Sequence, residues 1–72
     1  MDAIDDEHQR RDMATGLERD HPRWLVVYGV YTRQYVAFPR FDAPSGTILS
    51  AGMPGELVRR MQRTEARFAP PA

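Results

Sequence analysis

Side chains of the types that carry catalysis are few in this chain and lie far apart. The 72 residues include two histidines, His8 and His21, and no cysteine. Asp20 stands beside His21, but neighbours in sequence rarely reach the geometry of a catalytic pair, and the position before Pro22 is typical of a helix end. Without cysteine, thiolate nucleophiles and cysteine zinc sites are excluded. The sequence therefore predicts that the protein is not an enzyme and uses no metal, cofactor or small-molecule substrate.

The basic side chains point to a different chemistry, the binding of phosphate groups. All ten are arginines, whose forked guanidinium groups suit phosphate better than the lysine ammonium does. A row of them along a rigid helix is what nucleic-acid binding requires, although a solvated helix face in an arginine-rich protein has the same pattern. We therefore hold nucleic acid as the less expected partner. The candidate residues share one side of a predicted helix and are Arg59, Arg60, Arg63 and Arg67.

Charge is unevenly distributed along the chain, although the formal net charge is zero. Residues 1–20 carry seven acids against three arginines, which gives −4, and residues 21–72 carry seven arginines against three acids, which gives +4. Residues 1–10 are polar and acidic, and we expect a disordered arm or a frayed helix there. Such an arm either shields the basic surface or only keeps the protein in solution.

The spacing of apolar and turn-forming residues predicts two helices around three strands. Met13 and Leu17 are one helical turn apart, whereas the segment that starts at Trp24 is dense in β-branched and aromatic residues and is typical of a strand. Pro54 suits the first turn of a second helix. We expect helix, strand, strand, strand and helix over residues 11–20, 24–31, 35–38, 47–50 and 54–67.

These elements predict an α+β fold with the order α-β-β-β-α, in which a three-stranded antiparallel meander is flanked by two helices. We expect a single domain over residues 11–68, after the arm at residues 1–10 and before a disordered tail at residues 69–72. A chain of this length hides only about 60–65% of its unfolded surface, so its core is small. Such domains gain stability from a partner.

Both faces of the predicted hairpin are apolar, which is unusual for an antiparallel sheet with one side in water. Alternation along the first strand places Trp24 and Tyr28 on one face and Leu25 on the other. Each of the two faces must therefore pack against other residues, and a second copy of the chain or another protein would pack against one of them. The aromatic face could also stack on single-stranded nucleic acid, but ordinary packing is favoured. The expected protein interface consists of Trp24, Tyr28, Tyr35 and Phe41.

One stretch of the chain, followed by its predicted elements, has a recognisable layout. A hairpin, a strand after a Pro-Ser-Gly turn and an arginine-rich helix follow the stretch Glu18-Arg19-Asp20-His21-Pro22-Arg23-Trp24. This layout resembles that of a class of small actinobacterial proteins often encoded near helix-turn-helix regulators. The likeness covers residues 17–67, and the class has no agreed activity to carry over.

The predicted second strand ends in Phe-Pro and is followed by a turn, a short strand and a helix. The strand is Tyr35-Val36-Ala37-Phe38-Pro39, and Gly52 and Glu56 stand near the start of the helix. This arrangement faintly resembles that of HicB-type antitoxins, but Met53-Pro54-Gly55 replaces the acidic-Thr start of their helix, and the strand order differs.

The function that the sequence predicts is a small, non-enzymatic protein-interaction module, which forms a homodimer or binds a protein partner through an apolar sheet face. The alternative is a nucleic-acid-binding or antitoxin-like regulatory protein that uses the arginine face of the C-terminal helix. The longest apolar run is shorter than the roughly 20 residues that cross a bilayer, and the acidic N-terminus lacks the order of a signal peptide. We therefore expect a cytoplasmic bacterial protein with no membrane partner.

Overall fold

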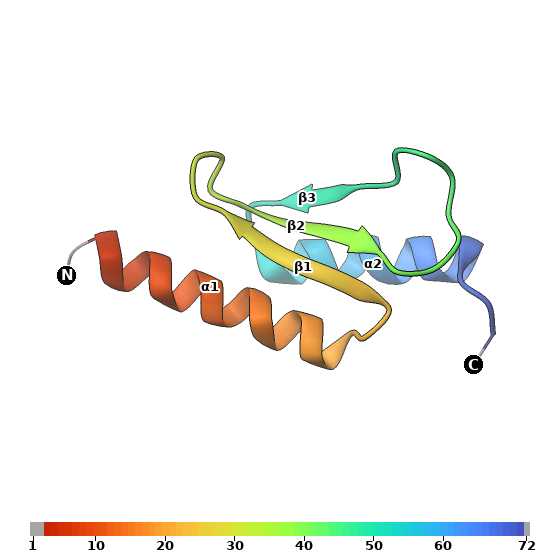
Figure 1. Ribbon diagram of the computed structural model, residues 1–72, viewed down its shortest axis with the longest axis horizontal. Helices are drawn as coiled ribbons and strands as arrows, with labels where there is room; N and C mark the ends of the chain where they lie inside the picture. The colour runs from red at the N-terminus through yellow and green to blue at the C-terminus, as the bar shows by residue number, and fades with distance from the viewer. Residues whose placement is uncertain (1–2, 72) are drawn as a thin grey trace.

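The computed structural model describes residues 3–71, which form two helices and one three-stranded sheet (Figure 1). The order of the elements confirms the predicted α-β-β-β-α layout and the α+β class. The elements are α1 (Ala3–Asp20), β1 (Trp24–Gly29), β2 (Gln34–Pro39), β3 (Leu49–Ala51) and α2 (Pro54–Phe68).

The sheet is an antiparallel meander in the order β1-β2-β3, as the sequence predicts. Figure 1 shows its strands in front of α2, with α1 beside β1. Ala14 of α1 and Leu57 and Met61 of α2 are buried in the same cluster of side chains. Both helices therefore pack on one face of the sheet, so the chain forms two layers with the core between them.

The hairpin between β1 and β2 turns earlier than the sequence predicts. Strand β1 ends at Gly29 instead of continuing to residue 31, and residues 30–33 form the turn. A Cβ atom at position 29 would lie 2.7 Å from the Thr32 hydroxyl oxygen, so a larger residue there would force Thr32 to shift. Arg33 closes the turn with a φ of 56° and donates its backbone N–H to the Gly29 carbonyl oxygen at 2.7 Å. The third strand is likewise shifted, to Leu49–Ala51 from the predicted 47–50.

Trp24 lies at the centre of the core and connects elements that are far apart in sequence. Its side chain is fully buried, and its indole Nε1–H donates to the Glu65 Oε2 atom of α2 at 2.7 Å. Its ring meets Phe41 edge to face, with 5.2 Å between ring centroids and an interplanar angle of 87°. Because the indole N–H has a partner, the whole side chain is buried without an unsatisfied donor.

Helix α1 begins at Ala3, well before the predicted start near residue 11, so residues 3–10 form a helix and not a disordered arm, in line with the helical alternative for the acidic segment. Two ion pairs one turn apart support this part of the helix, Asp6 with Arg10 at 3.0 Å and Glu7 with Arg11 at 3.1 Å. Acidic side chains also suit the N-terminal end of a helix dipole. Residues 1 and 2 of the expected arm lie outside the described part of the chain.

Helix α2 is amphipathic, as the spacing of its apolar residues predicts. Leu57 and Met61 are fully buried and Val58 is half-buried, whereas Phe68 in the last turn is exposed. Residues 69–71 follow without helix or strand, in the place of the predicted tail. The helix therefore brings its apolar stripe to the sheet and leaves its arginines outside.

Candidate interaction surface

The face of the sheet that the sequence marks as the interface is instead the core of the protein. Trp24 and Tyr35 are buried, and Tyr28 and Phe41 are half-buried against the same cluster. The register explains this result, because Trp24 pairs with Pro39 and Tyr28 with Tyr35 on the face that both helices cover. The prediction that these four residues form a contact surface is therefore corrected.

The opposite face of the sheet is the one that neither helix of the described chain covers. The register brings two rows of apolar side chains to it, Leu25 beside Phe38 and Val27 beside Val36, and Ser50 of β3 follows beside Val36. We call these five residues the outer face. Leu25 is 39% exposed and Val27 is 41% exposed, whereas Val36, Phe38 and Ser50 are partly exposed. None of the five side chains is charged.

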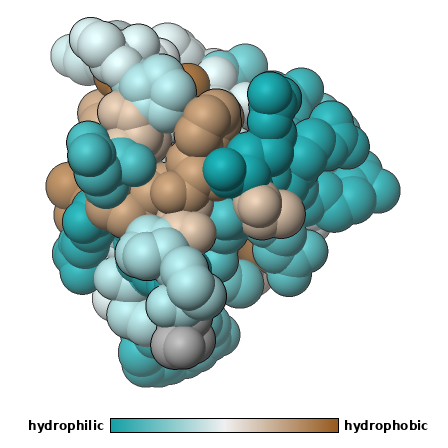
Figure 2. All heavy atoms as spheres, turned by 90° about the vertical axis from the view of Figure 1, so that its right-hand side faces the viewer, coloured by the Kyte–Doolittle hydropathy of each residue, from teal (hydrophilic) through white to brown (hydrophobic). Residues whose placement is uncertain are grey.

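Hydrophobic side chains also gather at one end of the molecule. Figure 2 views the end where β1 begins and β2 ends, and it shows a continuous hydrophobic area bordered by hydrophilic side chains. Single exposed apolar residues are normal on a protein surface, whereas a contiguous apolar area is typical of a contact site. The outer face is a second candidate for binding, because the register places its two exposed side chains, Leu25 and Val27, among further uncharged residues on one side of the sheet.

The free edge of β1 is closed by a side chain from α1. The backbone N–H of Val26 donates to Glu18 Oε1 at 3.0 Å, and the N–H of Trp24 donates to the His21 carbonyl oxygen at 3.0 Å. Arg40 lies 3.4 Å from Glu18 Oε2 and so holds the carboxylate in place. An incoming strand would have to displace the Glu18 carboxylate to reach the edge.

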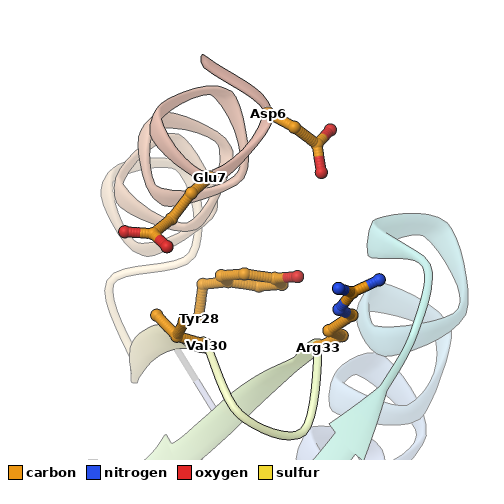
Figure 3. Close-up of a pocket in the computed structure, with 5 residues that line it drawn as sticks. All are labelled: Asp6, Glu7, Tyr28, Val30 and Arg33. Carbon is orange, nitrogen blue, oxygen red and sulfur yellow. The ribbon is translucent and has the colours of Figure 1, made fainter. Parts of the chain in front are cut away.

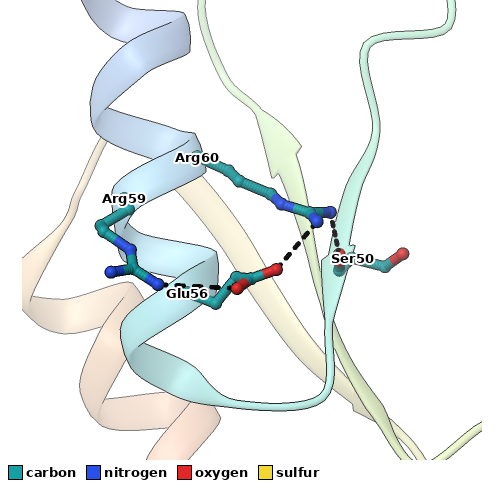
Figure 4. Close-up of polar contacts among 4 residues, drawn as sticks. All are labelled: Ser50, Glu56, Arg59 and Arg60. Carbon is teal, nitrogen blue, oxygen red and sulfur yellow. Dashed lines mark hydrogen bonds and ion pairs between the residues drawn. The ribbon is translucent and has the colours of Figure 1, made fainter.

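The free edge of β3 is closed in the same way by α2. Arg60 Nη1 donates to the Ser50 carbonyl oxygen at 2.8 Å, and Arg60 Nη2 donates to Glu56 Oε2 at 2.8 Å (Figure 4). Figure 4 shows the Ser50 side chain pointing away from the helix while its carbonyl faces the arginine. Each edge of the sheet therefore has a charged side chain in hydrogen-bonding contact with its backbone.

The predicted arginine face is partly used inside the protein. Arg59 and Arg60 share the carboxylate of Glu56, at 3.5 and 2.8 Å, and together with Arg63 they line a cavity of about 310 Å³. Arg67 lies apart from them in the last turn, with its guanidinium carbon 5.3 Å from the centre of the Phe68 ring. The structure thus brings three of the four arginines together, around one acid.

A second cavity, of about 330 Å³, opens between α1 and the β1–β2 turn (Figure 3). Arg10 stacks on the Tyr28 ring above this site, 5.7 Å from its centre. The hydrogen bond to Asp6, together with the charge of that carboxylate, raises the pKa of Arg10 above its ordinary value and keeps the guanidinium charged. The cavity is lined by Asp6, Glu7, Tyr28, Val30 and Arg33. Because both acids are already ion-paired, we interpret this cavity as a gap between packed elements and not as a binding site.

The remaining candidates for chemistry stay isolated. His21 follows α1, with its backbone N–H donating to the Leu17 carbonyl oxygen at 2.8 Å, as expected of a helix-end residue. Among the side chains that the structure describes, those of residues 6–71, no group of three or more His, Asp or Glu is placed to hold a metal ion. Neither described helix has the length and apolar character that crossing a membrane requires.

Comparisons with protein-family models, with curated proteins and with solved structures gave no match. The two family likenesses drawn from the sequence therefore stay predictions. No binding or edge-closing role is predicted from the sequence for Glu18, Leu25 or Val27. Alternation along the first strand already separates Leu25 and Val27 from Trp24, so the signal for the outer face was present. The edge position of Glu18 depends on how α1 packs and has no signal in the local sequence.

Proposed function

We propose that this protein is a non-enzymatic interaction module that binds another protein chain through the outer face. The observation that carries the proposal is the uncharged apolar face left open by the fold, with Leu25 and Val27 about two-fifths exposed. Burial of apolar surface stabilises association by about 25 cal/mol per Å², and a face without charged side chains adds no cost for removing charge from water.

The closed edges support a face-on mode of binding. Edge strands are the usual docking place for extended peptides, because their free N–H and C=O groups can pair with a new strand. In this protein Glu18 and Arg60 occupy backbone groups at the two edges. A partner that packs flat against the outer face leaves both contacts intact.

The arginine face supports a second candidate function, nucleic-acid binding. In its favour, Arg59, Arg60 and Arg63 line one surface cavity. Against it, Glu56 neutralises part of their charge and Arg60 is bound to the backbone of β3. A phosphate group would have to compete with both contacts, so we rank this function second.

Site-specific photo-crosslinking tests the proposed function. A small diazirine amino acid at Leu25 samples the outer face with little change of shape, and the same group at Gln62 samples an exposed position of α2. In cells of the encoding organism, we expect crosslinked products from position 25 and few or none from position 62. No products from position 25, or equal products from both, would overturn the proposal. Fractionation of the same cells checks the proposed cytoplasmic location.

A further inference from the structure

We infer that the partner of the outer face is a second copy of this chain, packed face to face about a two-fold axis. The dimer would have four layers, with helices outside and two sheets inside. This inference rests on the proposed function and names its partner. Three observations support it, concerning the edges, the charge and the arrangement of the outer face.

The edges of the sheet restrict how a second copy can approach. Edge-to-edge pairing would join the free edges of two sheets into one larger sheet. On β1, the N–H of Val26 is occupied by Glu18, and on β3, the carbonyl of Ser50 is occupied by Arg60. Pairing through either edge would break a contact of 3.0 Å or 2.8 Å that ties a helix to the sheet. Face-to-face packing breaks neither of these contacts.

The chemistry of the outer face restricts the kind of surface that fits it. Its four apolar side chains and Ser50 carry no charge, so a charged partner surface would lose water without gaining an ion pair. On this chain, the exposed side of α2 carries arginines and that of α1 carries both acids and arginines. An apolar, uncharged surface fits the outer face best, and a second copy of the outer face is such a surface.

The arrangement of the two rows favours a two-fold contact. Leu25 and Phe38 form a row of large side chains, and Val27 and Val36 form a row of smaller ones beside it. A two-fold axis across the strands, midway between the rows, places the large row of one copy over the small row of the other. Stacked sheets pack best when large and small side chains interdigitate in this way.

The size of the outer face sets the expected strength. Three strands spaced about 4.8 Å apart, with up to six residues rising about 3.3 Å each, give a face of roughly 14 by 20 Å. Two such faces cover about 560 Å² in total, which is below the usual range of stable specific interfaces and fits weak association. We therefore expect a dissociation constant in the micromolar range, with monomer and dimer in equilibrium.

The test is the mass of the purified full chain in solution as a function of its concentration, by sedimentation equilibrium. The wild-type mass should rise from 8.3 kDa towards twice that value as the concentration passes through the micromolar range. Val27→Glu places a charge on the outer face and should raise the dissociation constant by at least about 100-fold. Gln62→Glu adds the same charge on exposed α2 and should leave the dissociation constant unchanged.

A milder substitution at the same position distinguishes loss of the dimer from loss of the fold. Val27→Thr keeps the β-branched shape and should raise the dissociation constant by about 10-fold, with an unchanged circular dichroism spectrum. A wild-type chain that stays at 8.3 kDa up to millimolar concentration, or a dimer indifferent to both substitutions at Val27, overturns the inference. If the chain is a monomer but still crosslinks from position 25 to another protein, the proposed function stands and the inference that the partner is a second copy is refuted. A monomer without such crosslinks refutes the proposed function as well.

Discussion

The two faces of the sheet are built from similar residues and have opposite surroundings. The inner face carries Trp24, Val26, Tyr35 and Ala37, all buried beneath the helices, and the outer face carries Leu25, Val27, Val36 and Phe38, partly exposed. Residue type therefore does not decide which face becomes the core. The decision depends on the helices, since Ala14, Leu57 and Met61 all meet the same side of the sheet. What distinguishes the outer face is the absence of a cover within residues 3–71.

The largest expected effect comes from truncating one residue on each face. Trp24→Ala should lower the free energy of unfolding by about 3–5 kcal/mol, because it leaves a cavity in the core and removes the hydrogen bond to Glu65. Leu25→Ala, its neighbour on the outer face, should cost less than about 1 kcal/mol in the monomer. Urea unfolding at a concentration where the protein is monomeric measures both. Equal losses would contradict the assignment of inner and outer faces.

The sequence carries the order of the elements and much of the turn chemistry, but not the choice of face. Alternation predicts that Trp24 and Leu25 point to opposite sides, and the apolar stripe of α2 predicts one helix cover. Both faces contain valines and aromatics, so the burial of one of them depends on contacts between distant residues. The hydrogen bond between Trp24 and Glu65, 41 residues apart, is such a contact.

The start of α1 and the closed edges were beyond prediction for related reasons. The acidic segment has too few apolar residues to indicate a helix by periodicity, and its helix is supported by ion pairs such as Asp6 with Arg10. Glu18 and Arg60 look like ordinary surface charges in the sequence. Their role at the sheet edges follows from the placement of both helices on the inner face.

Substitutions at the edge of the sheet should change the free energy of unfolding less than substitutions in the core. Glu18→Ala should lower the free energy of unfolding by about 1–2 kcal/mol, because the N–H of Val26 loses its acceptor. Glu18→Gln keeps an acceptor oxygen and loses the ion pair with Arg40, so it should cost less than about 1 kcal/mol. Thermal unfolding compares the two. The alanine variant should also form higher oligomers through the opened edge, and its staying a simple monomer–dimer system would count against edge closure.

The smallest expected effect concerns the arginine face. Replacing Arg63 with alanine should change the free energy of unfolding by less than about 0.5 kcal/mol, because it is exposed on α2. The wild-type chain should show little retention on immobilised DNA or RNA at low salt. Strong retention that falls with added salt and is reduced by Arg63→Ala would move the binding surface from the outer face to α2.

The most direct test of the outer face as the contact surface is a dilution series followed by amide chemical shifts. Between millimolar and low-micromolar concentration, the account predicts shifts concentrated at Leu25, Val27, Val36 and Phe38 and their strand neighbours. The amides of α2 from Arg59 to Arg67 should stay in place. Unchanged spectra across the series, or shifts concentrated on α2, would contradict the self-association of this protein through its outer face.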